Sequence, residues 1–153
     1  MCVVARTYRS GSCTLDQKAR QVFASMRVSY VRKVQSPLIL VVEDVHETRD
    51  GIEELLKADG YRVALARDEQ DAIESAQLKR PDLILVSLAG LSGEVLVTVR
   101  RIQERAAVED QIPAVVFWVE DIGEGEEVAI GGNVYLTRPD NFNQLRSLLA
   151  RLL

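Results

Sequence analysis

The feature that most constrains the fold of this chain is a set of short runs in which consecutive residues are apolar. Residues 38–42 read Leu-Ile-Leu-Val-Val, residues 83–86 read Leu-Ile-Leu-Val directly after Asp82, and residues 114–119 read Ala-Val-Val-Phe-Trp-Val. A strand with one face in water alternates apolar and polar residues, so continuous runs indicate strands that are buried on both faces. Such strands are typical of parallel sheets that carry helices on each side.

Segments with helical spacing of apolar residues lie between these runs. They predict helices at residues 48–58, at residues 69–78 after a cap at Asp68, at residues 93–105, and after a cap at Asn141, where Leu145, Leu148, Leu149 and Leu152 face inward. Two further strands are predicted at residues 61–66 and 134–137. Residues 120–132 contain four glycines, which leave room only for a short, weak helix, because glycine costs about 1 kcal/mol relative to alanine in a helix interior.

The outcome is a five-fold alternation of strand and helix, an α/β pattern. Parallel strands need crossover connections, and five of them fit a flavodoxin-like sheet of order 2-1-3-4-5 with helices on both faces. In that order the first and third strands are neighbours, and ligands bind beyond the carboxyl ends of the strands at this point. We therefore expect the functional residues at the strand ends.

Composition and targeting signals exclude several classes of protein. The 153 residues are 47% hydrophobic and 27% charged, which is ordinary for a globular domain and unlike disordered or fibrous chains. No apolar run approaches the roughly 20 residues that cross a bilayer, and residues 1–10 lack a secretory signal, so we expect a cytoplasmic protein without membrane contact. Cys2 and Cys13 lie outside any plausible core, which excludes a disulfide framework.

Charge divides the chain into two parts. Residues 1–36 carry seven basic side chains and one acid, whereas residues 37–153 carry 12 basic and 22 acidic side chains. We predict a basic N-terminal extension at 1–36, either helical or disordered, and one domain at 37–153. The extension is interpreted as a solvated tail rather than a nucleic-acid-binding arm. Met26 could also start a shorter product, so residues 1–25 are open as part of the native protein.

Three segments of the domain carry a family resemblance. Residues 38–44, 81–86 and 135–139, in this order and spacing, resemble the CheY-like receiver domain of bacterial two-component response regulators, and the resemblance covers residues 38–153. Receivers hold Mg²⁺ with an acidic pair after the first strand and accept a phosphoryl group on an aspartate after the third. They also use a hydroxyl residue after the fourth strand, a lysine after the fifth, and an aromatic switch residue three positions before that lysine.

The resemblance implies a divergent site. Glu43 and Asp44 match the acidic pair, and Tyr135 matches the aromatic switch residue. The phosphoacceptor, hydroxyl and lysine positions are occupied by Ser87, Trp118 and Arg138. A serine hydroxyl is neutral at pH 7 and needs an adjacent base to attack phosphorus, so Ser87 does not replace an aspartate directly.

The remaining site residues have structural interpretations. Arg138 is expected to form an ion pair with Glu43 or Asp44, and Trp118 to be part of the core or to fill the pocket. Without a third charge, Glu43 and Asp44 should bind Mg²⁺ only weakly, and no other cofactor is expected. His46 is interpreted as a solvated loop residue, because no second histidine exists to complete a transition-metal site.

Several functions remain open from the sequence. The first is a stand-alone pseudo-receiver in phosphorelay signalling, not an enzyme, which contacts a histidine kinase or effector through residues 123–132 and Tyr135 without being phosphorylated. The second is an active single-domain regulator phosphorylated on Ser87, Glu43 or Asp44. A nucleotide- or flavin-binding module ranks lower, because the turn at residues 43–47 is acidic and lacks glycine. Nucleic acid is not favoured as a partner, and a dimer is allowed but not required.

Overall fold

The computed structural model describes residues 35–108 and 111–153. The chain divides into the units Met1–Ser36 and Pro37–Leu153, and all the elements below belong to the second. The helical segment predicted within the basic extension lies outside the described residues. No helix in the described part of the chain has the length and apolar character to cross a membrane.

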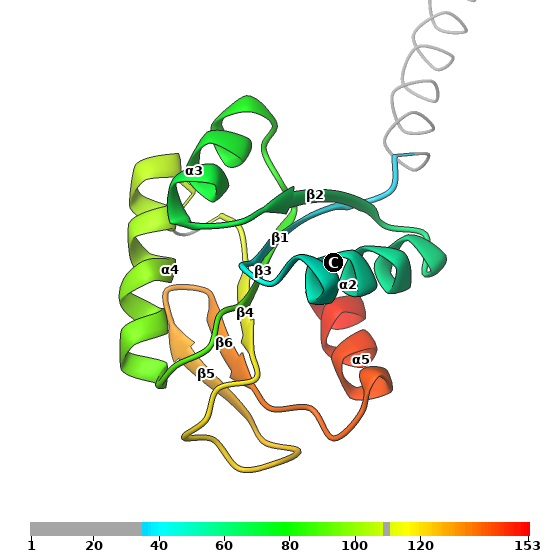
Figure 1. Cartoon of the computed structure of the whole chain (residues 1–153), viewed down its shortest axis with the longest axis vertical. Helices are drawn as coiled ribbons and strands as arrows, with labels where there is room; N and C mark the ends of the chain where they lie inside the picture. Colours follow the sequence, from blue (N-terminus) through cyan, green and yellow to red (C-terminus); the bar gives the residue numbers. More distant parts are fainter. Residues whose placement is uncertain (1–34, 109–110) are drawn as a thin grey trace, which may run out of the picture. The chain divides into compact units, whose positions relative to one another are not determined.

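A six-stranded sheet forms the centre of the domain, in the order β2-β1-β3-β4-β6-β5 (Figure 1). Its strands are β1 (Leu38–Glu43), β2 (Arg62–Ala66), β3 (Leu83–Ser87), β4 (Ala114–Phe117), β5 (Glu127–Gly131) and β6 (Val134–Thr137). The five predicted strands are all present and run parallel in the expected order, with β6 as the fifth of them. β5 is an additional strand at the edge and runs antiparallel to β6.

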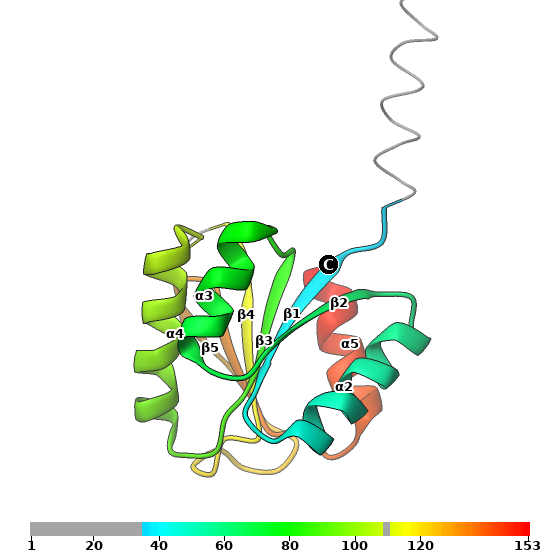
Figure 2. The ribbon, with the colours of Figure 1, turned by 45° about the horizontal axis from the view of Figure 1, so that its top comes forward.

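Helices cover both faces of this sheet, as the sequence predicts. They are α2 (His46–Ala58), α3 (Glu69–Leu78), α4 (Ser92–Ala106) and α5 (Phe142–Leu152). α2 and α5 lie on one face, and α3 and α4 lie on the other (Figure 2). Successive strand residues point to opposite faces, so Ile39 and Val41 pack under α2 and α5 while Leu40 and Val42 pack under α3 and α4.

Side-chain caps start two of the helices where the sequence predicts them. Asp68 accepts a hydrogen bond from the Asp71 N–H at 2.8 Å, and Asn141 accepts one from the Gln144 N–H at 3.2 Å. These bonds satisfy backbone donors that an α-helix leaves unpaired in its first turn. Local capping residues therefore fix where α3 and α5 begin.

The start of α4 is capped from a distant part of the chain. Asp121 accepts the Ser92 N–H at 3.0 Å and also accepts the Ser92 hydroxyl. These two bonds from Ser92 lower the pKa of Asp121. A carboxylate at a helix N-terminus is also favoured by the helix dipole. The contact attaches the segment after β4 to the start of α4.

The weak helix predicted for residues 120–132 is absent, and this prediction was wrong. A β-hairpin of β5 and β6 occupies its place, with Gly132 and Asn133 as the two turn residues at φ values of 60° and 59°. Two positive φ values are what the tight turn of a hairpin requires, and glycine and asparagine adopt them at low cost. The sequence signal for this turn is Gly-Asn between two apolar runs.

The fourth strand ends earlier than predicted. β4 stops at Phe117, because Trp118 has a φ of 65°, in the left-handed region. This conformation turns the indole out of the sheet, and Val119 re-enters the core under α3 and α4 with 1% of its surface exposed. The apolar run at residues 114–119 therefore contains a strand and a backbone reversal, which apolarity alone does not reveal.

Candidate functional site

A pocket of about 310 Å³ lies beyond the carboxyl ends of β1, β3 and β4. It is lined by Glu43, Asp44, Val45, Thr48, Ser87, Leu88, Ala89, Trp118 and Glu120. The fold thus brings together four of the site residues that the sequence predicts, from three separate strand ends. We call this hollow the acidic pocket.

The buried acid of this pocket is held by its neighbours. Glu43 is 4% exposed and lies opposite Ser87 in the register between β1 and β3. The Ser87 hydroxyl donates a hydrogen bond to the Glu43 carboxylate, and the Val45 N–H donates another to Oε1 at 3.0 Å. Ser87 is therefore positioned as a donor to Glu43 across the two strands.

Burial raises the pKa of the Glu43 carboxyl above its ordinary value of 4.5. The hydrogen bonds from Ser87 and Val45 oppose this effect, while the adjacent Asp44 adds to it. Desolvation disfavours the charged form of a carboxyl, so the fold favours protonated Glu43 relative to the unfolded chain.

Trp118 separates the acidic pocket from a second hollow, which we call the apolar groove. We expected Trp118 either in the core or in the pocket. It is 56% exposed, so it is not part of the core, and its side chain lines both hollows. A left-handed conformation in a bulky residue costs about 1–3 kcal/mol and is concentrated at functional sites. Here it places the indole at the surface between two concave regions.

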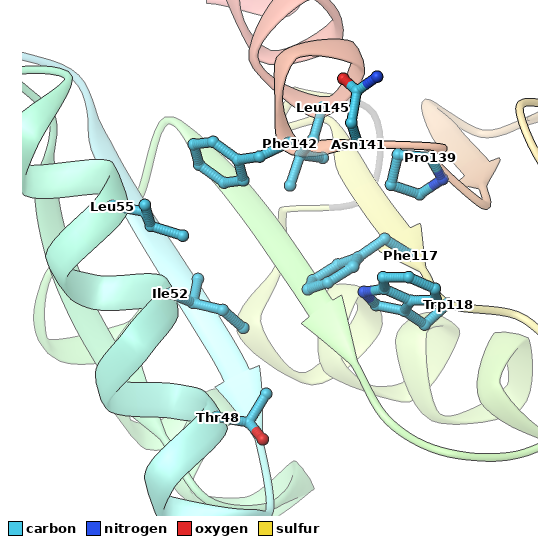
Figure 3. Close-up of a pocket in the computed structure, with 9 residues that line it drawn as sticks. All are labelled: Thr48, Ile52, Leu55, Phe117, Trp118, Pro139, Asn141, Phe142 and Leu145. Atoms are coloured by element: carbon cyan, nitrogen blue, oxygen red, sulfur yellow. The ribbon is translucent and has the colours of Figure 1, made fainter.

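The apolar groove has a volume of about 190 Å³ and lies between α2 and α5. Figure 3 shows Thr48, Ile52 and Leu55 of α2 on one side and Asn141, Phe142 and Leu145 on the other, with Phe117, Trp118 and Pro139 completing the lining. Leu55 is 43% exposed, which is unusual for a leucine on the inner stripe of a helix. The groove therefore presents apolar surface to solvent next to the acidic pocket.

Arg138 does not form the ion pair that the sequence predicts. Within the described residues it has no ion pair with Glu43 or Asp44, and its guanidinium Nη1 donates to the Ile122 carbonyl at 3.3 Å. Its backbone N–H donates to the Glu126 carbonyl at 3.1 Å. The segment before β5 folds against Arg138 and takes its side chain away from the acidic pair.

Tyr135 and His46 lie outside the centre of the acidic pocket. Tyr135 is half-buried and packs against the core under α2 and α5. His46 is solvent-exposed as predicted, but it is the first residue of α2 rather than part of a loop. Its Nε2 lies 3.4 Å from the Asp50 carboxylate, and its Nδ1 lies 3.0 Å from the Arg49 guanidinium.

Comparison with known proteins accounts for this arrangement of an acidic pair at the carboxyl end of a parallel sheet. The family described as response regulator receiver domain matches residues 39–150. The chain belongs to this family. Its receiver domain is a module of two-component signalling.

Several curated relatives of this receiver are named as transcriptional regulatory proteins. The chain is 33% identical over 112 residues to the transcriptional regulatory protein PrrA of Mycobacterium tuberculosis, covering 69% of this chain and 45% of the relative. It is 32% identical over 108 residues to the transcriptional regulatory protein AfsQ1 of Streptomyces coelicolor, covering 67% of this chain and 45% of that protein. The chain thus spans less than half the length of these relatives.

Solved structures agree on the fold. The receiver domain of the sensor histidine kinase PA1611 from Pseudomonas aeruginosa, with a magnesium ion in its active-site cleft, is 30% identical with a TM-score of 0.59, covering 77% of this chain and 98% of that one. The Vibrio cholerae chemotaxis protein CheY4 is 21% identical with a TM-score of 0.60, covering 78% of this chain and 100% of that one. The second likeness supports the fold alone.

The acidic pocket of this receiver offers an incomplete set of metal ligands. Among residues 35–108 and 111–153, no group of three or more histidine, cysteine, aspartate or glutamate side chains is arranged to hold a metal ion. Glu43 and Asp44 supply two carboxylates, and the first of them is already hydrogen-bonded by Ser87. Mg²⁺ binds through one or two carboxylates and several waters, so the pair fits a weak site.

Sequence reasoning missed the apolar groove and the non-local cap of α4. Helical spacing places Ile52 and Leu55 on the same face of their helix, and the exposure of Leu55 depends on α5, which is distant in the sequence. Asp121 gave no local signal either, because it caps a helix that begins 29 residues earlier. Residue spacing along one element cannot detect contacts of this kind.

The raised pKa of Glu43 predicts an effect of pH on stability. Protonated Glu43 contributes to the free energy of unfolding, and this contribution is fully present below the pKa of the unfolded chain. It is lost as pH rises through the higher pKa of the folded protein. Glu43→Gln should therefore be more stable than the unmodified protein at pH 7, and this difference should close as pH falls through the folded pKa toward 4.5. Denaturant unfolding from pH 4 to 8 measures this difference.

A matched control for this measurement is Glu54→Gln, which changes an exposed glutamate of α2. Its stability difference from the unmodified protein should vary much less over the same pH range. If the stability advantage of Glu43→Gln over the unmodified protein instead grew as pH fell, the fold would favour the ionised carboxylate. That result would contradict a raised pKa for Glu43.

Proposed function

We propose that this chain is a pseudo-receiver, a signalling module that contacts a partner protein without being phosphorylated. The observation that supports this most is the position of Ser87, whose hydroxyl stands at the end of β3 and donates to the buried Glu43. Receivers carry an ionised aspartate at this position, and that carboxylate is both nucleophile and metal ligand. A neutral hydroxyl supplies neither property.

The rest of the pocket also lacks the groups that phosphoryl transfer requires. Within residues 35–108 and 111–153 the carboxylate bonded to Ser87 is that of Glu43, and one carboxylate cannot act as the base for Ser87 while it serves as a metal ligand. Arg138 is directed to the Ile122 carbonyl rather than toward the acidic pair. The positive charge that would neutralise a phosphoryl group is therefore displaced.

Magnesium binding is proposed as weak and not essential. By analogy with the magnesium-containing PA1611 receiver, Glu43 and Asp44 would hold the ion, which supplies positive charge to the pocket when bound. Asp44 is exposed to solvent, whereas ionised Glu43 is disfavoured by burial. No further cofactor is proposed.

The partner is proposed to be a signalling protein of the cytoplasm, either a histidine kinase or a downstream effector. The apolar groove supports this role, because Leu55 and Trp118 expose 43% and 56% of their surfaces beside the acidic pocket. Aromatic and aliphatic anchors in a concave site, with charged residues around them, are typical of protein interfaces. The contact would not depend on the state of Ser87.

Phosphorylation is tested by incubating the full chain with acetyl phosphate and Mg²⁺ and measuring its intact mass. We expect no mass increase of one phosphoryl group, under conditions in which a receiver with an aspartate acceptor is modified. An adduct that disappears in Ser87→Ala would overturn the proposal in favour of an active regulator with a serine acceptor. An adduct that persists in Ser87→Ala but disappears in Glu43→Gln or Asp44→Asn would assign the acceptor to the acidic pair.

A further inference from the structure

The free edge of β5 is the feature that the signalling role leaves unexplained. β5 is the last strand of the sheet, and all five of its residues are exposed. Val128 and Ile130 are 43% and 39% exposed, although an edge strand of a monomer is normally short, charged or covered. β5 is last in the strand order, so no strand of the sheet lies beyond it, and Figure 1 shows α4 beside the hairpin of β5 and β6.

The residues of β5 provide little protection against strand pairing. The segment Glu127–Gly131 contains no lysine and no proline, which are common blocking residues at sheet edges. Its one charged side chain, Glu127, is bound by Arg151 of α5, with both carboxylate oxygens 2.6 Å from Nη2. The edge itself therefore carries no unpaired charge within these five residues.

Backbone geometry indicates which groups face outward. The Arg138 N–H donates to the Glu126 carbonyl, and backbone groups alternate between the two sides of a strand. Glu126 and Val128 thus face β6, while Glu127 and Ala129 present N–H and C=O groups to the free edge. A bulge between Ala129 and Gly131 ends the regular part of the edge.

We propose that this edge pairs with the same edge of a second copy of the chain, antiparallel, with Val128 opposite Val128. In this register Glu127 of each copy faces Ala129 of the other, and about four backbone hydrogen bonds can form without using the bulged residue. No two charges of β5 then lie directly opposite each other. The proposal does not depend on whether Ser87 is phosphorylated.

Charge around the strand favours a second copy in the antiparallel direction. Glu124 and Glu126 precede β5 in the chain. At the other end of the strand, Arg100 of α4 lies with its Nη2 3.3 Å from the Gly131 carbonyl. Antiparallel pairing brings the acidic end of one copy to the Arg100 end of the other. Parallel pairing would place the acidic ends together, and like charges in register are destabilising.

Cysteine cross-linking tests the register directly. Val128→Cys is introduced in a full chain that also carries Cys2→Ser and Cys13→Ser, so that only the new thiol can react. Directly opposed residues of this kind have Cα atoms about 4.5 Å apart, within the range of a disulfide. We expect rapid formation of a covalent dimer on mild oxidation, whereas Leu78→Cys, at a position 88% exposed on α3, should remain monomeric.

Sedimentation velocity tests the association itself. The unmodified chain should show a monomer–dimer equilibrium that Ala129→Pro shifts to monomer, because proline removes an outward N–H without affecting pairing to β6. Val128→Lys should act in the same way through its charge, while Leu78→Lys should leave the dimer intact. Circular dichroism shows whether each variant folds. If Ala129→Pro or Val128→Lys does not fold, the other of these two variants provides the test of the dimer.

Three outcomes would overturn the proposal. The unmodified chain could be monomeric at every concentration, which would leave the edge for a strand of another protein. A dimer could persist in folded Ala129→Pro and Val128→Lys, which would place the interface elsewhere. Finally, Val128→Cys and Leu78→Cys could cross-link at equal rates, which would indicate random collision.

Discussion

Replacement of Ser87 by aspartate is expected to turn a weak magnesium site into one that stabilises the folded domain. The new carboxylate would stand opposite Glu43 in the β1–β3 register and beside Asp44 at the same pocket. Three carboxylates around one position repel each other, so the variant should be less stable than the unmodified protein without metal. Mg²⁺ relieves this repulsion and should restore the loss.

The size of the effect follows from binding linkage. A ligand that binds only the folded state at about 100 times its Kd adds roughly 2.7 kcal/mol to the free energy of unfolding. We expect Ser87→Asp to gain stability of this order in millimolar Mg²⁺, measured by thermal or urea unfolding, while the unmodified protein gains much less. Ser87→Asn, which changes shape but adds no charge, is the control.

The result distinguishes two explanations of the weak site. If Ser87→Asp gains no more from Mg²⁺ than Ser87→Asn, then the position of Glu43 and Asp44, rather than the missing charge, limits metal binding. A large gain in the unmodified protein would instead show that two carboxylates suffice, and would contradict our interpretation of the pocket.

Two adjacent leucines of α2 are expected to separate stability from partner binding. Leu56 is fully buried among the residues under α2 and α5, whereas Leu55 is 43% exposed at the apolar groove. Leu56→Ala should lower the free energy of unfolding by about 2–5 kcal/mol, because it removes buried methyl groups and leaves a cavity. Leu55→Ala should cost about 1 kcal/mol or less, since much of its side chain already faces water.

Partner binding should be affected more by Leu55→Ala than by Leu56→Ala. Leu55→Ala removes an anchor of the proposed contact surface, so it should weaken capture of a signalling partner although the domain remains folded. Denaturant unfolding and a binding assay with candidate histidine kinases measure the two effects separately. Equal losses of stability for both variants would show that Leu55 is part of the core, and unchanged binding in Leu55→Ala would remove the groove from the interface.

The parallel sheet was predictable because its strands are buried on both faces. The runs at Leu38–Glu43 and Leu83–Ser87 leave no face for water, and that pattern has few other solutions in a chain of this size. Caps at Asp68 and Asn141 were predictable for a different reason, since each bonds to a backbone N–H three residues later. Information of this kind is contained in a short stretch of sequence.

Other features depend on contacts between distant segments. The hairpin was missed because four glycines were interpreted as a weak helix, although Gly132 and Asn133 supply the φ values of a tight turn. The positions of the candidate site residues Glu43 and Ser87 could be predicted, because both lie at strand ends. The direction of Arg138 was not, because it depends on how the segment before β5 folds back on it.

The backbone reversal at Trp118 makes the intrinsic fluorescence of this residue a reporter of both hollows. This is the one tryptophan of the chain, and it stands between the acidic pocket and the apolar groove with more than half of its surface in water. Its emission is therefore sensitive to the filling of either hollow. Ions that enter on one side and apolar side chains that enter on the other would change its surroundings in different ways, so unlabelled protein can report which of the two hollows is occupied.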